Sequence, residues 1–427
     1  MQKRFFLGLC VALTLVMNSS VIKADELAAP KSSDWNQWRG PNRDGISPEK
    51  GLLQRWPKAG PKLIYQSKGL GGGYSSVVYS NGRLFTMGNF GGQANLVAVD
   101  AANGDVLWKT PMGSGEPNCT PTVDGDRVYA LSRVGDLVCA NVTKGKILWR
   151  VNFQRDFGGR MMSGWGYSES PLVDGNRLII TPGSKTAAMA ALNKMNGNVI
   201  WKAAMPPNTG NRGRDGAGYS SIVISNAART KQYVQLTGRG VISVDARSGK
   251  LLWGYNRVAN GTANIPTPIV KGDHVFASSG YGTGAALLKI VKRGRRVIAQ
   301  EVYFLPASTF QNHHGGMILF GKHIYTGHGH NKGFPLCIEM LTGKVVWGPK
   351  RGPGGGSAAI ALADGQLYFR YQNGIMALIS ATPRGYQLSG SFKLASKRGQ
   401  SWPHPCISDG RLFIRDQDVL LCYDLRK

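Results

Sequence analysis

The chain has few acidic residues for its length of 427. Asp and Glu number 24 against 52 Lys and Arg, which gives a formal net charge of +28. This shortage of carboxylates disfavours a calcium-rich protein, because calcium prefers oxygen ligands. The cationic excess favours anionic partners, such as an acidic polysaccharide, an anionic membrane face or nucleic acid. A solvated, self-repelling surface is the alternative interpretation.

Long apolar runs are also missing. Lys3-Arg4 precede an apolar run of about a dozen residues, and small and polar residues follow up to Ala24, an order typical of a secretory signal. A membrane span needs about 20 apolar residues. Cys10 lies inside the apolar run, which argues against a lipoprotein cleavage site. We therefore expect residues 1–24 to be removed near Ala24, leaving a soluble periplasmic or extracellular protein. Nucleic acid is then the least expected partner.

Glycine, in contrast, is abundant. The 58 glycines are roughly twice the usual share of about 7%. Many of them fall in a recurring sequence motif, called the repeat phrase below, which is seen in residues 96–108 and 241–253. It consists of an apolar strand, an Asp or Asn, a turn with Gly, a second apolar strand and a closing Trp. Two apolar runs joined by such a turn predict a β-hairpin.

The closing Trp gives the period of the repeat. It recurs at Trp108, Trp149, Trp201, Trp253 and Trp347, and the spacing between the first four is 41, 52 and 52 residues. The copy between the last two runs from Leu287 to Glu301, with Ala299 expected in the Trp position, and a degenerate copy runs from residue 375 to 388. A second phrase of two strands joined by a polar turn with Gly precedes each copy. Four strands in 41 to 52 residues indicate a propeller blade.

The two ends of the chain complete the count. The last unit has only three strands, ending at residues 419–424, and residues 62–66 look like the missing fourth strand. Pairing them would remove the open sheet edge of a linear array. We therefore predict an all-β, eight-bladed propeller of four-stranded antiparallel blades over residues 62–427. Residues 25–61 would form a strap across it, and each Trp would pack between neighbouring blades.

Cysteine is scarce as well. Beyond Cys10 there are five, with no adjacent pair and no Cys-x-x-Cys-His motif, so covalent haem attachment is unsupported. Three of the five occupy a strand position at which other copies have Ala or Ser, and we predict that they are small buried packing residues: Cys139, Cys337 and Cys422. Pairing of Cys119 with Cys406 stays open.

The phrase resembles the pyrroloquinoline-quinone (PQQ) repeat, Ala-Leu-Asp-x-x-Thr-Gly-x-x-x-Trp, over nearly the whole mature chain. This repeat is found in quinoprotein alcohol dehydrogenases and in the BamB-type outer-membrane assembly protein. The resemblance implies either a binding or assembly module, or an oxidoreductase that uses PQQ with calcium on an alcohol or sugar. The dehydrogenases' adjacent cysteine pair and a complete acidic ligand set are not found here, nor is the assembly protein's lipid-anchor cysteine. The chain looks most like exported bacterial proteins that carry the repeat without these features.

Four residues are candidates for holding a cofactor or ligand. Trp165 and Glu169 lie in the loop that leads into blade three, and Asn312 lies before blade six. Arg39 lies in the strap. An aromatic ring beside an arginine suits a planar or anionic ligand, and the resemblance implies Glu and Asn as calcium ligands. Packing and solvation of long loops is the alternative.

The seven histidines divide between the two faces of the predicted propeller. His274 and His323 begin second strands, where other blades have Arg, and should be surface residues. The other five fall in loops that share one face: His313, His314, His328, His330 and His404. Neutral imidazoles suit a transition metal. A ligand pocket without metal and a hydrogen-bonded polar lining are the alternatives.

A cationic run lies on the opposite face, in the hairpin of blade five. It comprises Lys289, Lys292, Arg293, Arg295 and Arg296. A solvated cluster or docking to an anionic surface would explain it. Our leading hypothesis is an exported binding or assembly module with a histidine-rich pocket and a protein, polysaccharide, membrane-surface or small-molecule partner. The quinoprotein-like oxidoreductase is the alternative.

Overall fold

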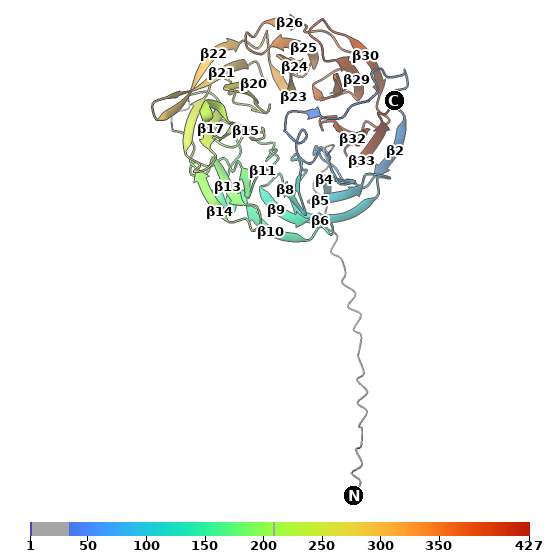
Figure 1. Cartoon of the computed structure of the whole chain (residues 1–427), viewed down its shortest axis with the longest axis horizontal. Coiled ribbons are helices and arrows are strands. Elements are labelled where there is room, and N and C mark those ends of the chain that lie inside the picture. Colours follow the sequence, from blue (N-terminus) through green and yellow to red (C-terminus); the bar gives the residue numbers. More distant parts are fainter. Residues whose placement is uncertain (2–33, 208–209) are drawn as a thin grey trace.

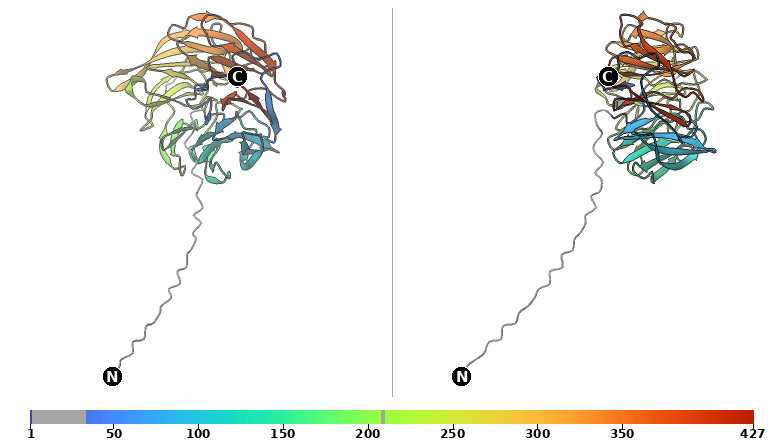
Figure 2. Two further views of the ribbon diagram at one scale, coloured as in Figure 1. Left: turned by 45° about the vertical axis from the view of Figure 1, so that its right-hand side comes forward. Right: turned by 90° about the vertical axis from the view of Figure 1, so that its right-hand side faces the viewer.

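Eight sheets are arranged around a central axis as a flat disc (Figure 1), which Figure 2 shows edge-on at the right. The computed structural model describes Met1 and residues 34–207 and 210–427. Apart from Met1, the predicted signal peptide 1–24 lies outside the described residues, as do residues 25–33 of the strap. No helix within the described ranges is both long and apolar enough to span a membrane.

Blades one to four follow one another along the chain, each with four antiparallel strands. Their strands are β3 (Val78–Ser80), β4 (Arg83–Phe90), β5 (Gln93–Asp100), β6 (Val106–Ser114), β7 (Thr122–Asp124), β8 (Arg127–Leu131), β9 (Asp136–Asn141), β10 (Ile147–Asn152), β11 (Leu172–Asp174), β12 (Arg177–Ile180), β13 (Met189–Asn193), β14 (Val199–Ala203), β15 (Val223–Ser225), β16 (Gln232–Thr237), β17 (Gly240–Asp245) and β18 (Leu251–Tyr255). Two short helices, α1 (Phe153–Phe157) and η1 (Ala227–Arg229), interrupt this series.

Blades five to eight continue the series, and the last of them takes its fourth strand from the N-terminal region. Their strands are β19 (Ile269–Lys271), β20 (His274–Ser279), β21 (Gly284–Arg293), β22 (Arg296–Leu305), β23 (Asn312–Phe320), β24 (His323–His328), β25 (Phe334–Glu339), β26 (Val345–Trp347), β27 (Ala358–Ala363), β28 (Gln366–Tyr371), β29 (Ile375–Ser380), β30 (Leu388–Lys393), β31 (Cys406–Ser408), β32 (Arg411–Asp416), β33 (Val419–Asp424) and β2 (Leu63–Lys68).

The ring closes as predicted, through β2 and β33. The two strands pair antiparallel, with Tyr65 opposite Cys422, and they lie side by side in blue and red in Figure 1. The Tyr65 hydroxyl also donates to the carbonyl of Ala101 in blade one, at 3.0 Å. The blade that joins the two ends of the chain is therefore bonded to the next blade as well.

Three of the five closing Trp residues, Trp108, Trp149 and Trp347, donate a hydrogen bond to the next blade. Trp108 donates its indole N–H to the carbonyl of Val142 in blade two at 3.1 Å, and Trp347 donates to that of Thr382 at 2.8 Å. The Gly in the turn of one blade also packs against the closing Trp of the preceding blade. Gly249 of blade four has φ +71°, and a Cβ there would lie 2.5 Å from the ring of Trp201 in blade three. The phrase therefore encodes a contact between blades, in agreement with the predicted position of the Trp.

Blade five corrects one prediction. Its aromatic closing residue is Tyr303, which pairs with Leu287 and donates its hydroxyl to the carbonyl of Met340 in blade six. Ala299, expected in this position, pairs with Ile290 instead. The prediction was wrong because β21 and β22 are ten residues long, so the turn lies farther from the closing position than in other blades.

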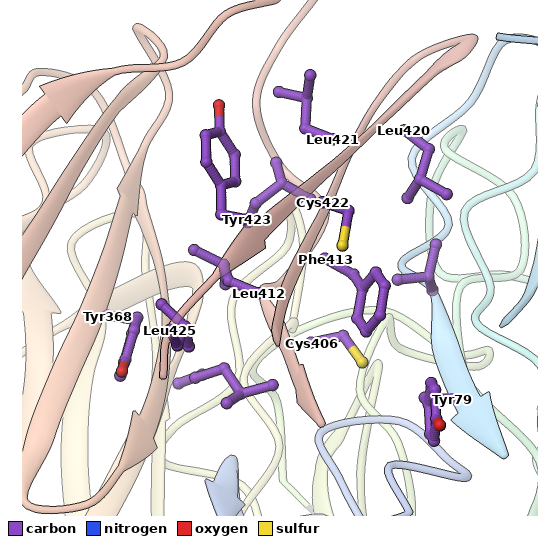
Figure 3. Packing of buried hydrophobic residues seen from close by; sticks show 14 of the residues in the cluster. Tyr79, Tyr368, Cys406, Leu412, Phe413, Leu420, Leu421, Cys422, Tyr423 and Leu425 are labelled. Atoms are coloured by element: carbon purple, nitrogen blue, oxygen red, sulfur yellow. The ribbon is translucent and has the colours of Figure 1, made fainter. Parts of the chain in front are cut away.

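The small strand position opposite the aromatic residue is filled as predicted. Cys139 pairs with Trp149, and Cys337 pairs with Trp347. Figure 3 shows Cys422 and Cys406 among the apolar residues of blade eight. All five cysteines in the described ranges are buried and free, so Cys119 and Cys406 do not pair with each other.

The first part of the described strap, residues 34–47, runs along the inner edges of several blades, and Trp56 further on bonds to Ser389 in the outer strand of blade seven. Trp35 exchanges backbone hydrogen bonds with Tyr79 of blade one, and the N–H of Val123 in blade two donates to the carbonyl of Asn36. The short strand β1 (Ile46–Ser47) pairs parallel to β27 of blade seven. The strap therefore lies across the hub and forms a floor within it.

Candidate functional site

A pocket of about 270 Å³ lies at the hub, where the loops that lead into the blades meet the strap. Six of its lining residues are Trp or Tyr, three are His, and one is Arg. The lining comprises Trp38, Arg39, Tyr74, Asn118, Trp165, Ser168, Tyr219, Ala263, Ile265, Pro266, Thr267, Tyr281, His313, His314, Gly316, Trp402 and His404. It contains no Asp, Glu, Lys or Cys. The pocket is therefore aromatic and close to neutral inside a cationic protein.

Aromatic side chains form one wall of the pocket. Tyr74 and Trp402 lie 4.6 Å apart between ring centroids at an interplanar angle of 37°, and Trp165 approaches the same Trp402 edge-on at 6.0 Å. The Trp165 side chain is 50% exposed, which is a large apolar area to leave in water. Rings held apart in this way present both faces and edges to a ligand.

A hydrogen-bond network holds the loop that carries Trp165. Ser163 donates to the carbonyl of Thr262 at 2.6 Å, so the Tyr219 hydroxyl donates to Ser163 at 2.6 Å. Tyr219 in turn accepts from the backbone N–H of Trp165 at 3.3 Å. Asn118 donates to the carbonyl of Trp165 at 2.9 Å. Trp165 is thus positioned by groups from three other loops.

Arg39 belongs to the floor of the pocket. Its guanidinium donates to the carbonyls of Met317, at 2.5 Å, and Asp44, at 3.2 Å, while its Nε–H has no partner among the described residues. Burial lowers its pKa to about 10, partly offset by the nearby Asp44 carboxylate. Arg39 is still charged at neutral pH, and it supplies a buried positive charge with one donor unused.

Three of the five predicted histidines reach the pocket, and burial keeps them neutral. His313 bonds to Ser357 at 2.7 Å and to Tyr281 at 3.1 Å through its two ring nitrogens, and burial lowers its pKa to about 4. Burial, helped by Arg39, lowers the pKa of His404 to about 3, and that of His314 falls well below its usual value. The Nε2 of His314 has no hydrogen-bond partner among the described residues.

The other two histidines do not line this pocket. His328 accepts from the backbone N–H of Gln311 at 3.3 Å and, with His330, lines a separate cavity beside blade six. The His330 ring contacts those of His313 and Tyr281, with centroids 4.3 Å apart. No group of three or more His, Cys, Asp or Glu in the described ranges has the geometry of a metal site. Both nitrogens of His313 are also engaged, so the arrangement does not fit the metal centre that we hypothesised.

Glu169 and Asn312, the remaining cofactor candidates, lie buried outside the lining. Glu169 accepts from the backbone N–H of Thr181 at 2.5 Å and from Gln235 at 3.1 Å, and burial raises its pKa to about 7. Asn312 donates to the Thr326 hydroxyl at 2.8 Å within its own blade. Because both side chains are used within the scaffold, they do not fit a calcium ion beside a quinone.

Most of the aromatic lining was not among the predicted site residues. Tyr74, Tyr219, Tyr281 and Trp402 were missed. A local signal exists for two of them, because the tetrapeptide Gly-Tyr-Ser-Ser recurs at residues 73–76 and 218–221. In both copies the Tyr lines the pocket, while the two serines are buried just before the inner strand.

Comparison with known proteins places this architecture in a family. The family model described as outer membrane protein assembly factor BamB matches residues 37–131 and 92–349, which together exceed half of the chain. The chain belongs to this family. It therefore carries the PQQ-type repeat that BamB shares with quinoprotein dehydrogenases, as the repeat phrase predicted.

Individual relatives are more distant. Tetrathionate hydrolase of Acidithiobacillus ferrooxidans is 26% identical over 174 residues, which are 39% of this chain and 32% of that protein. This chain thus matches about a third of that relative's length. The crystal structure of BamB from Moraxella catarrhalis has a TM-score of 0.59 at 14% identity, covering 86% of this chain and 98% of that one. The crystal structure of quinohemoprotein alcohol dehydrogenase from Comamonas testosteroni has a TM-score of 0.62 at 11% identity, covering 92% of this chain and 81% of that one. These structures share the fold.

Proposed function

We propose that this protein is an exported binding module of the BamB family, and that its hub pocket holds a compact, planar ligand with a polar group. The observation that carries the proposal is the convergence of six Trp and Tyr side chains, supplied by five blades and the strap, on one pocket. Concave sites lined by aromatic rings with a few placed polar groups are the usual form of small-molecule sites.

The polar groups of the pocket define the expected orientation of the ligand. Arg39 and His314 both line the pocket, and the Arg39 Nε–H and the His314 Nε2 are buried without a hydrogen-bond partner among the described residues. Buried polar groups without partners cost about 1–3 kcal/mol each, and a ligand that pairs with them recovers that cost. We therefore expect the ring system of the ligand to stack on the Trp402 wall and its polar group to point inward.

The quinoprotein-like oxidoreductase remains the alternative, and the chemistry of the lining disfavours it. Calcium needs carboxylate or carbonyl oxygens, and the lining has no carboxylate. Glu169 and Asn312, which would supply those ligands, are bonded within the scaffold. The residues of the lining suit stacking and hydrogen bonding of a ligand.

A direct test measures the binding of planar probes to the purified protein. Anilinonaphthalene sulfonate is titrated while its fluorescence is followed, with wild type and with Trp402→Ala. Removing one ring of the wall should weaken binding by about tenfold, since an aromatic pair contributes up to about 1.5 kcal/mol. Leu341→Ala is the control, because Leu341 is 57% exposed in a turn outside the pocket. Equal affinity in all three proteins would contradict the proposal.

The same protein distinguishes the alternative. PQQ is added with and without calcium, and reduction of an electron-accepting dye is followed with a set of alcohols and sugars. Binding of PQQ that is independent of calcium, with no dye reduction, is what the proposal predicts. Calcium-dependent binding with dye reduction would establish the oxidoreductase instead.

A further inference from the structure

The hairpin of blade five is built differently from the other hairpins. Its strands, β21 and β22, are ten residues long, and no other strand in the described ranges exceeds nine. Figure 1 shows this hairpin projecting beyond the rim of the disc, and Figure 2 shows the same projection after a 45° rotation. The extra length is not needed to close the blade, because Tyr303 already makes that contact.

The projecting end of this hairpin carries only cations as charged residues. All five of these side chains are exposed: Lys289, Lys292, Arg293, Arg295 and Arg296. None of them makes an ion pair or a side-chain hydrogen bond with the part of the chain that the structure describes. The nearest acidic residue on β22, Glu301, lies at the base of the hairpin and pairs with Arg257 at 2.7 Å.

The register places two like charges opposite each other. Arg293 faces Arg296 across the two strands, next to the turn. Directly opposed like charges destabilise a strand pair. The hairpin therefore carries an unfavourable arrangement that nothing within the described protein offsets, and an external anionic surface would offset it.

We propose that the tip of this hairpin, residues 289–296, docks on the anionic headgroups of a lipid surface. The hairpin projects from the rim, and alternation of side chains along the strands puts Lys289, Arg293 and Arg296 on one of its faces, so these three cations can meet a flat surface together. The tip has no aromatic or amide side chain to stack on a sugar ring or to bond specific groups, and its other residues are Gly, Val and Ile. Recognition there depends on charge alone, which suits a membrane surface.

The expected size of the effect follows from the number of charges. A Lys or Arg close to an anionic bilayer contributes about a fivefold gain in binding. Neutralising two of the five should therefore weaken binding by about 25-fold. A protein of net charge +28 also has general attraction to anionic surfaces, so the experiment must separate the hairpin from the overall charge.

The test uses co-sedimentation of the full-length mature protein with vesicles of phosphatidylglycerol and phosphatidylcholine, compared with vesicles of phosphatidylcholine alone. The variant is Arg293→Ser with Arg296→Ser. The matched control is Arg247→Ser with Lys250→Ser, which removes the same charge from exposed positions in the corresponding hairpin of blade four. Thermal melting of both variants establishes that they fold. We expect about 25-fold weaker partitioning for the blade-five variant and less than threefold for the control.

Three results would overturn the proposal. Equal loss in both variants would mean that binding follows net charge, and absence of wild-type binding to the anionic vesicles would exclude the membrane. Retained vesicle binding by the blade-five variant, with loss of its retention on a sulfated polysaccharide column, would identify a polysaccharide surface instead. If the Ser variant does not fold, Arg296→Glu replaces it, because Glu opposite Arg293 converts the repulsion into an attraction.

Discussion

Trp56 of the strap fills the space that Gly390 leaves open in blade seven. Gly390 pairs with Leu378 at the position where other blades have a closing Trp or Tyr, and a Cβ on Gly390 would lie 2.8 Å from the Cβ of Trp56. The indole packs edge-on against Tyr368 and Phe392, with ring centroids 5.6 and 5.2 Å apart. The strap therefore supplies the aromatic ring that this blade lacks.

Replacing Trp56 should destabilise the whole ring. Trp56 is 4% exposed, and truncating a buried Trp to Ala typically costs about 3–5 kcal/mol because a cavity remains. We expect Trp56→Ala to lose free energy of unfolding in this range, measured by denaturant titration of tryptophan fluorescence. Trp165→Ala is the comparison, since that ring is half-exposed, and it should lose less than half as much. Similar losses would mean that Trp56 does not complete blade seven.

Substitution of a turn glycine should cost more where a Trp ring covers the glycine than where none does. Gly249 and Gly125 both have positive φ, +71° and +58°, so an Ala strains the backbone at either position. Only at Gly249 would the new Cβ meet a Trp ring. We expect Gly249→Ala to cost about 1–3 kcal/mol more than Gly125→Ala, from the added overpacking. Urea titration measures both, and equal losses would contradict the contact between blades.

His404 should make the protein acid-sensitive. Its pKa is lowered from 6.5 to about 3, mainly by burial, so between these pH values the unfolded chain binds a proton that the folded chain excludes. Its contribution to stability is complete above pH 6.5 and is lost as the pH falls towards 3, by about 1.4 kcal/mol per pH unit. His404→Gln removes this titration while its amide can still donate to the His314 carbonyl. The stability of wild type minus that of the variant should therefore fall below pH 6.5, and a constant difference would exclude the effect.

The scaffold was largely predictable because it depends on residues close together in sequence. The Asp, Gly and Trp of each hairpin indicated the blades, and the strand at residues 62–66 indicated the closure. Trp56 was not predictable, because its position depends on the absence of a side chain at Gly390, more than 300 residues away in the chain. The site was only partly predictable for the same reason: Arg39, Trp165 and three histidines reach the pocket, while Glu169 and Asn312 point into their blades. Sequence patterns identify a loop, but packing decides which side chains of that loop reach the hub.

The loop that carries Trp165 should loosen when the Tyr219 hydroxyl is removed. Tyr219→Phe deletes the bond to Ser163 and leaves the Trp165 N–H without its acceptor. One lost hydrogen bond costs about 1 kcal/mol, so the Trp165 amide should exchange with deuterium about fivefold faster or more, while strands far from the hub keep wild-type protection.

Tyr281→Phe is the matched control, because it deletes a hydroxyl in the same pocket, bonded to His313 instead of the loop. Faster exchange at Trp165 in both variants would indicate general loosening of the pocket, and unchanged exchange in both would show that Tyr219 does not hold the loop. If only Tyr219→Phe loosens it, probe binding should weaken in that variant as well, since the half-exposed Trp165 ring would no longer be held at the rim before the ligand arrives.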